Sequence, residues 1–236
     1  MNSVFFNEDF AEKFYVFRNR EDAGSKLGYW LRDLGVDADI VYGVPAGGVP
    51  VALRVAEVLG CKLDVLICRK PLIPWNREAG FGAVAPDGAF FFDVAYAISP
   101  RLPYEDIVNA IREQREEIAR RLTRYRCNQN YVKYGDKAVV VDDGIAAGFT
   151  MRAAVEFLRK LGVSKVLVAV PTCHTESAVR IAKLADAVYC LNPRSTPLYA
   201  VADAYQEWRD LEDQDVLEYL RIAKAKGILA YKGDCI

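Results

Sequence analysis

The sequence predicts an α/β protein with an open, twisted, mainly parallel sheet and helices on both of its faces. Five short runs rich in valine and isoleucine recur along the 236 residues, and most of their positions are apolar. Strands that are covered on both faces have this pattern. Helix-type spacing of apolar residues lies between the runs, and such alternation favours a parallel sheet with right-handed connections. The expected strands are residues 38–44, 63–68, 138–141, 165–170 and 187–191.

Three helices are expected between these strands. Residues 49–59 and 150–161 carry apolar side chains at helical spacing. Gly60 and Gly162 follow them directly, and glycine is a common residue just beyond the end of a helix. Residues 176–184 form the third expected helix.

One segment, residues 94–134, interrupts the alternation and is expected to be a largely helical insertion. Its only strand-like run is residues 94–98, and residues 104–126 have the pattern of a long charged helix with isoleucines on one stripe. A solvated amphipathic helix explains this pattern. An arm that brings its arginines to an anionic ligand, or that packs against a second subunit in a homodimer, explains it as well.

The charge balance argues against a nucleic-acid partner. The chain has 31 basic and 32 acidic residues, so its formal net charge is −1, whereas proteins that neutralise phosphate backbones have a basic excess. No apolar run approaches the ~18 residues of a membrane span, and the N-terminal sequence lacks the basic start and apolar run of a signal peptide. A cytoplasmic protein without a membrane partner is therefore expected.

The six cysteines do not indicate a metal site, since none forms a CxxC pair and His174 is the single histidine. Cys127 and Cys235 lie in polar surroundings. A disulfide between them is an alternative that the sequence leaves undecided, and it applies if the protein comes from a hyperthermophile. The other cysteines lie in or beside expected strands and are predicted to be buried. They are Cys61, Cys68, Cys173 and Cys190.

The strongest local signal for function is the sequence VVVDDGIAAGFT at residues 139–150. An apolar strand leads into Asp142 and Asp143, and residues 142–150 form what we call the acidic loop. Ligands of open α/β sheets bind beyond the carboxyl ends of the strands. Glycines let backbone N–H groups face inward, and a helix N-terminus adds partial positive charge, so the loop can hold a phosphate. Because neighbouring carboxylates bind vicinal hydroxyls or a divalent cation, the loop suits a sugar phosphate.

This stretch resembles the 5-phosphoribosyl-1-pyrophosphate (PRPP) signature of type I phosphoribosyltransferases. In that signature an apolar strand, two acidic residues and a short loop precede a glycine, one residue and then Thr or Ser. The resemblance implies that Asp142 and Asp143 bind the ribose hydroxyls. Family members have Thr or Ser at the place of Ala147, so one hydroxyl donor is missing here, worth roughly 1.5–3 kcal/mol. The residues implied to bind the 5-phosphate are Ala146, Ala147, Gly148, Phe149 and Thr150.

A second loop resembles the pyrophosphate loop of the same family. Residues 43–49, with the sequence GVPAGGV, form the glycine loop, in which backbone amides can approach a pyrophosphate closely. Relatives in one uncharacterised subgroup have Arg at the place of Ala46, so a charged contact is missing here. The basic pair after the next strand lies where family members often direct positive charge towards pyrophosphate, although simple strand-end charge is the alternative. The residues implied to bind pyrophosphate are Ala46, Gly47, Gly48, Arg69 and Lys70.

The resemblance extends over residues 15–220, because residues 17–24, 80–88 and 198–204 are similar to a subgroup of predicted phosphoribosyltransferases. It implies one domain over residues 1–236, with a small hood formed by terminal segments. It also implies a reaction in which a nitrogenous acceptor displaces pyrophosphate from PRPP. Mg²⁺ would be the cofactor, held through PRPP and by the two aspartates of the acidic loop. The identity of the acceptor does not follow from the sequence.

Two other functions remain open. Ala46 and Ala147 each remove a side-chain ligand, which favours a protein that senses PRPP or a nucleotide without turnover. A hydrolase or phosphorylase of a related phosphoribosyl compound is the third option.

His174 follows a strand, and Trp75 lies between the basic pair and a glycine-rich stretch, so both are candidate acceptor contacts. A solvent-facing helix start and ordinary loop packing are the respective alternatives.

Overall fold

The computed structural model describes residues 3–73, 76–92 and 103–236. Its centre is a six-stranded sheet in the order β1-β10-β9-β8-β2-β3, and every pair of neighbouring strands is parallel. All five expected strands are present in this sheet, and of its six strands the edge strand β1 alone was not predicted. The strands are β1 (Ser3–Phe6), β2 (Ile40–Gly43), β3 (Lys62–Val65), β8 (Lys137–Val141), β9 (Lys165–His174) and β10 (Ala187–Arg194).

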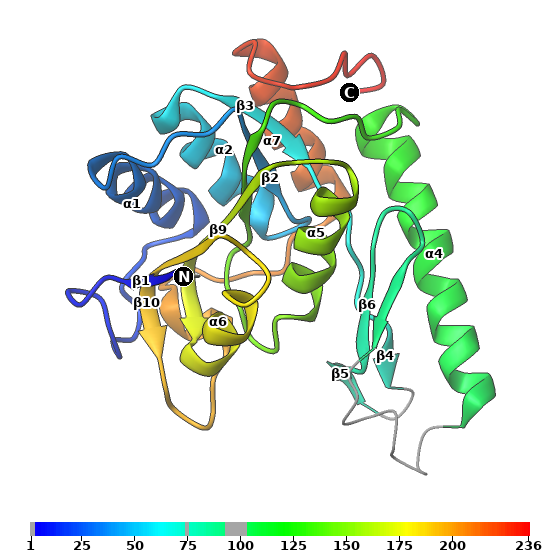
Figure 1. Ribbon diagram of the computed structural model, residues 1–236, viewed down its shortest axis with the longest axis horizontal. Coiled ribbons are helices and arrows are strands. Elements are labelled where there is room, and N and C mark those ends of the chain that lie inside the picture. The colour runs from blue at the N-terminus through cyan, green and yellow to red at the C-terminus, as the bar shows by residue number, and fades with distance from the viewer. Residues whose placement is uncertain (1–2, 74–75, 93–102) are drawn as a thin grey trace.

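Helices cover both faces of the sheet, as the alternating pattern predicts (Figure 1). Val41 and Ile40 of β2 belong to different core clusters. The cluster with Val41 contains residues of α1 (Arg20–Asp33), α2 (Gly48–Leu59) and α7 (Asp213–Ala225). The cluster with Ile40 contains residues of α5 (Phe149–Lys160) and α6 (Thr175–Ile181).

Helix α1 was not predicted, and its two glycines explain why. Glycine is a poor helix former, so Gly24 and Gly28 weaken the helical signal of the sequence. In the fold they let α1 lie directly on α2, since a Cβ at Gly24 would come within 2.6 Å of the Val51 carbonyl oxygen. The helix begins where the Asn19 side chain accepts a hydrogen bond from the Asp22 amide. This cap places Arg20 at the carboxyl edge of the sheet.

The insertion contains the long helix that the sequence predicts, α4 (Tyr104–Arg126), beside two small hairpins (Figure 1). Its arginines contact acidic residues of the same chain. Arg126 donates two hydrogen bonds of 3.0 Å to the buried Asp64 of β3, and three other arginines surround Asp213 of α7. The expected run at residues 94–98 lies outside the described residues. The hairpin strands are β4 (Leu72–Ile73), β5 (Asn76–Gly80), β6 (Gly82–Val84) and β7 (Phe90–Phe92).

Cys127, at the end of α4, forms a disulfide with Cys235 near the C-terminus. The pairing that the sequence left open is therefore present, and it ties the last residues of the chain to α4. The other four cysteines are free and buried, as predicted. Within the described residues, no helix combines the length and the apolar content needed to cross a bilayer.

Candidate functional site

The acidic loop lies at the carboxyl edge of the sheet, between β8 and α5. It is held against β9 by two backbone hydrogen bonds, from Ile145 N–H to the Thr172 carbonyl (3.0 Å) and from His174 N–H to the Ile145 carbonyl (2.8 Å). Gly148 then adopts a φ of +84°, a left-handed conformation that glycine takes without strain, and α5 begins at the next residue. The loop between these fixed points is open, with Ala146 and Ala147 exposed.

The backbone N–H groups of residues 146–151 have no acceptor within the part of the chain that the structure describes. The first hydrogen bond of α5 runs from Arg152 N–H to the Gly148 carbonyl (2.9 Å), so the preceding amides stay unpaired. Unpaired amides at a helix N-terminus, with the positive end of the helix dipole behind them, are suited to hold an anion. This geometry agrees with the phosphate-binding role that the sequence resemblance implies.

We expect a crystal grown in sulfate to contain an anion at these amides, about 3 Å from the N–H nitrogens of residues 146–150. The measurement is the difference density at this loop. A crystal in which sulfate binds elsewhere on the protein while these amides bond only water would contradict the assignment.

A cavity of about 230 Å³ lies directly beside the unpaired amides. Asp142, Lys70 and Val201 line it together with the acidic loop. Lys70 comes from the segment after β3, and its stem lies over Gly80, where a Cβ would meet Lys70 Cγ at 2.1 Å. Arg69 points elsewhere, since its Nε donates to Gln114 of α4 (3.1 Å). Of the predicted basic pair, the structure therefore brings only Lys70 to the acidic loop.

The glycine loop touches the acidic loop. A Cβ at Gly47 would lie 1.9 Å from Oδ2 of Asp143, so only glycine fits here with the carboxylate where it is. Gly48 N–H donates to the Val44 carbonyl (2.9 Å), so this amide already has an acceptor within the glycine loop. The N–H groups of Ala46 and Gly47 have no acceptor among the described residues. Two of the three amides predicted to bind pyrophosphate are thus available for a ligand.

The two carboxylates of the acidic loop differ in their surroundings. Burial raises the pKa of Asp142 well above its usual range, and the neighbouring Asp143 raises it further. Burial also raises the pKa of Asp143, but the guanidinium of Arg20 opposes this effect with a 2.9 Å contact from Nε to Oδ2. The Asp143 carbonyl accepts a 2.6 Å hydrogen bond from the Tyr205 hydroxyl.

The sequence analysis did not identify Arg20 as a site residue, although a signal was present. A cation in the first turn of a helix is repelled by the helix dipole, so an arginine there indicates a specific partner elsewhere.

His174 and Trp75 are the two candidate acceptor contacts from the sequence. The ring of His174 packs edge-on against Tyr199 with 5.9 Å between centroids, and its backbone N–H bonds to the acidic loop. Trp75 lies outside the described residues.

A parallel sheet whose central strand ends in two carboxylates, followed by unpaired amides at a helix N-terminus, defines an α/β protein with a site for a sugar phosphate. Comparison with known proteins narrows this class. The model of the phosphoribosyl transferase domain matches residues 89–203. Curated sequences from two strains of Mycobacterium tuberculosis, each named "Putative phosphoribosyl transferase", are 37% identical over 208 residues, or 87% of this chain and 46% of theirs. The chain thus spans about half the length of the curated relatives it matches.

A solved structure is similar to this chain over most of its length. The crystal structure of TT1426 from Thermus thermophilus is 34% identical, with a TM-score of 0.69, and the match covers 86% of this chain and 97% of that one. The chain belongs to the phosphoribosyltransferase family. The resemblance found in the acidic and glycine loops is therefore confirmed at the level of the family.

Proposed function

We propose that this chain binds PRPP between the acidic loop and the glycine loop and transfers its phosphoribosyl group to a nitrogenous acceptor, with release of pyrophosphate. One observation carries the proposal. The unpaired amides of residues 146–151 lie beside the cavity that Asp142 lines, so a phosphate site and a hydroxyl-binding carboxylate adjoin each other. A ribose 5-phosphate group requires this combination.

Each part of PRPP then has a partner. The amides of residues 146–150 bind the 5-phosphate, and the aspartate pair of the acidic loop serves the ribose hydroxyls. The amides of Ala46 and Gly47 and the ammonium group of Lys70 bind the pyrophosphate. Arg69, which the sequence also predicts for this role, is left out of the assignment because its Nε is bonded to Gln114 of α4. The protein contributes by positioning the substrate and by stabilising the charge that develops on the departing pyrophosphate.

The donor chemistry of the site suits Mg²⁺. Asp142 lines the cavity, and carboxylate oxygen is a ligand that this ion prefers. Enzymes that act on phosphates commonly hold Mg²⁺ through one or two carboxylates together with the phosphates of the substrate. Asp142 would supply the protein ligand, and the ion would neutralise charge on the phosphates of PRPP.

We assign the hood that the resemblance implies to two segments that lie far apart in the sequence. Residue Phe17 pairs with Tyr205 as a parallel bridge, and Gln206 N–H donates to the Phe17 carbonyl (2.8 Å). We propose that residues 7–18 and 195–209 together form the hood over the acceptor, within one domain of residues 1–236. A homodimer stays a prediction, which light scattering tests directly.

Titration calorimetry with PRPP and Mg²⁺ tests the proposed ligand, with ribose 5-phosphate and pyrophosphate as separate controls. We expect PRPP to bind more tightly than either fragment, because it occupies both loops at once. Release of pyrophosphate with a panel of nitrogenous bases, against a control without acceptor, then tests turnover. Binding without release across the panel would favour the sensing alternative, and absence of PRPP binding would contradict the proposal.

Restoring the missing hydroxyl at position 147 is expected to tighten PRPP binding. Ala147→Thr adds a donor beside the 5-phosphate, and the net gain is about 1 kcal/mol, or roughly fivefold in affinity, after the cost of fixing the side chain. Ala147→Ser is the control for the β-branch of threonine. If both variants fold and neither binds PRPP or ribose 5-phosphate more tightly, residue 147 does not face the phosphate.

A further inference from the structure

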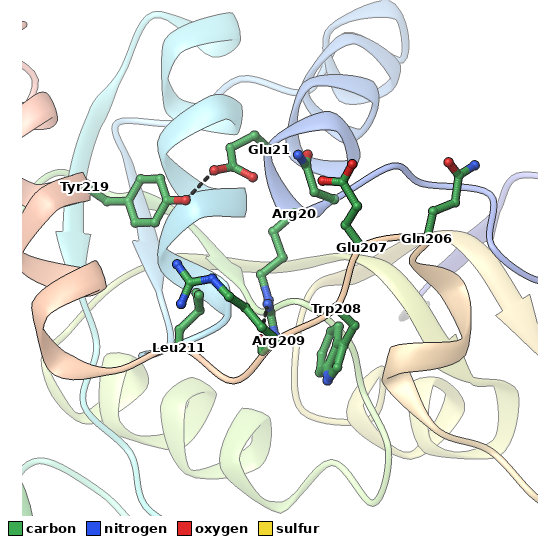
Figure 2. Close-up of a pocket in the computed structure, with 9 residues that line it drawn as sticks. Arg20, Glu21, Gln206, Glu207, Trp208, Arg209, Leu211 and Tyr219 are labelled. Carbon is green, nitrogen blue, oxygen red and sulfur yellow. Dashed lines mark hydrogen bonds between the residues drawn. The ribbon is translucent and has the colours of Figure 1, made fainter.

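A second cavity, of about 460 Å³, lies between the start of α1, helix α7 and the segment of residues 206–211 that precedes α7. It shares no lining residue with the cavity beside the acidic loop. Figure 2 shows the side chain of Arg20 leaving α1 towards Trp208 and Arg209 in this cavity. The binding of PRPP proposed above does not use this space.

Arg20 lines this second cavity and has one nitrogen without a partner. The residue is only 7% exposed. Its Nε donates to Asp143 (2.9 Å) and its Nη1 donates to the Arg209 carbonyl (2.9 Å), whereas its Nη2 has no acceptor within residues 3–73, 76–92 and 103–236. An unpaired N–H group on a buried cation costs free energy. This nitrogen therefore indicates a ligand that brings a hydrogen-bond acceptor into the cavity.

The other charges of the cavity favour a ligand that also carries N–H groups. Its two guanidiniums are neutralised by aspartates, since Arg20 pairs with Asp143 and Arg209 donates to both carboxylate oxygens of Asp215 (2.9 and 2.6 Å). Two lining carboxylates have no cationic partner in the part of the chain that the structure describes, and one of them accepts the Tyr219 hydroxyl. Such carboxylates repel phosphates and accept hydrogen bonds from N–H donors. They are Glu207 and Glu21, which binds Tyr219.

Trp208 adds an aromatic surface to the same cavity. It is 38% exposed, and the guanidinium carbon of Arg20 lies 3.8 Å from the centre of its ring, so the indole is held in place while part of it stays open. Planar heterocycles stack on indole rings that are held in this way. The cavity thus offers a flat surface, one N–H donor and carboxylate acceptors.

We propose that this cavity binds the nitrogenous acceptor, and that the acceptor is a planar heterocycle in which an amino group, a ring N–H and a ring carbonyl are neighbours. The two N–H groups donate to the carboxylate of Glu207, the carbonyl accepts from Arg20 Nη2, and the ring stacks on Trp208. The role as acceptor site rests on the proposed function. It follows from position, because Arg20 lines the cavity and bonds to Asp143 of the acidic loop, and Trp208 belongs to the proposed hood.

The transfer is a substitution at the ribose. A ring nitrogen that does not face Glu207 forms a bond to C1, and pyrophosphate leaves with the electron pair of the bond that breaks. The heterocycle loses one N–H proton to solvent, so no oxidant or further reactant is needed.

Isocytosine is the probe, because it carries an amino group, a ring N–H and a ring carbonyl side by side. Uracil has the same shape with an oxygen in place of the amino group, and 2-aminopyrimidine lacks the carbonyl. Binding to the full chain is followed by the shift of the Trp208 indole N–H signal in nitrogen-15 NMR spectra, assigned by its absence in Trp208→Leu. Isocytosine should bind about tenfold more tightly than either control compound, because each of these loses a hydrogen bond to a charged group.

Glu207→Gln tests the carboxylate at an exposed position, where the change of an oxygen to an amide group leaves the fold intact. The preference for isocytosine over uracil should fall from about tenfold to within about twofold, because an amide can turn either its oxygen or its NH₂ group to the ligand. Glu218→Gln is the matched control, since Glu218 is an exposed residue of α7 that pairs with Arg221 (3.6 Å) and does not line the cavity. Isocytosine that leaves the Trp208 signal unshifted, or a preference that Glu207→Gln does not change, would overturn the proposal.

Pyrophosphate release from PRPP and Mg²⁺ with isocytosine tests the role as acceptor site, and binding in the cavity without release would overturn that role. The NMR experiment needs no PRPP, so it separates this inference from the proposed function. If isocytosine shifts the Trp208 signal and calorimetry detects no PRPP binding, the proposed function fails and the heterocycle site stands. If PRPP binds and none of the three compounds shifts the signal, the inference fails while the proposed function stands.

Discussion

Replacing Asp142 with asparagine is expected to weaken PRPP binding about 100-fold, because hydrogen bonds from the ribose hydroxyls to a charged acceptor contribute roughly 1.5–3 kcal/mol each. The same change should make the unliganded protein more stable at neutral pH. Asp142 is a half-buried carboxylate next to another carboxylate, and burial and the charge of Asp143 together outweigh the hydrogen bond that its Oδ1 accepts from Asp143 N–H (2.9 Å). Loss of function with a gain in stability distinguishes a binding residue from a structural one.

The direction of the stability change follows from the pKa of Asp142, which burial and Asp143 raise well above its usual range. A carboxyl group whose pKa is raised on folding binds protons more tightly in the folded state. Between the ordinary pKa of about 3.9 and the raised value, the free energy of unfolding therefore decreases as the pH increases. Asp142→Asn removes this decrease, so its advantage should be large at pH 7 and vanish below about pH 4.

Melting curves at both pH values and calorimetry with PRPP measure the two effects. Asp37→Asn is the control, since Asp37 is an exposed carboxylate that pairs with Lys137, the first residue of β8, and the acidic loop follows the last residue of that strand. It should leave PRPP affinity unchanged. An Asp142→Asn protein that binds PRPP like the unmodified chain would contradict the ribose assignment. The change is made at Asp142 alone, because the same change at Asp143 would leave the buried Arg20 without its partner.

The sheet was predictable because its signals are local. Each inner strand is buried on both faces, so its composition alone separates it from the helices and loops. The helix at residues 104–126 was predicted with the bounds that the structure has, since its apolar stripe is long and regular. The open acidic loop was predictable for a similar reason, because two carboxylates and small residues follow one another in the sequence.

The rest of the site depends on contacts between segments that are far apart in the sequence. Arg20 and Asp143 are separated by 123 positions, so no local pattern pairs them. Arg69 and Lys70 are neighbours with similar charge, and only the packing of α4 draws Arg69 to Gln114 while Lys70 lines the cavity. The hydrogen bond from Gly48 N–H to the Val44 carbonyl likewise depends on the turn that the backbone makes.

Gly47→Ala is expected to abolish PRPP binding and to destabilise the fold by about 2 kcal/mol, a typical cost of overpacking. The new methyl group would lie 1.9 Å from Asp143 Oδ2, and the carboxylate cannot yield freely because Arg20 holds it. The φ of Gly47 is −62°, which alanine adopts without strain, so the whole effect comes from this contact. The glycine loop must then move, and its amides leave the position that a pyrophosphate requires.

Gly35→Ala is the contrasting variant. Gly35 has a φ of +72° and no atom within 4 Å of the position that a Cβ would take, so alanine there suffers backbone strain and no collision. Its cost should be about 1 kcal/mol of stability, with PRPP and pyrophosphate affinity unchanged. Calorimetry with pyrophosphate and melting curves of both variants make the comparison. Equal effects of the two changes on ligand binding would mean that Gly47 is not part of the site.

A double-mutant cycle identifies the colliding group. In a protein that already carries Asp143→Ala, the carboxylate is absent, so the additional cost of Gly47→Ala should shrink by most of its value. The two changes act on atoms in contact, and such pairs depart from additivity by about 0.5–3 kcal/mol. If the two costs simply add, the carboxylate of Asp143 does not set the position of the glycine loop. The coupling therefore tests whether the two loops act as one site.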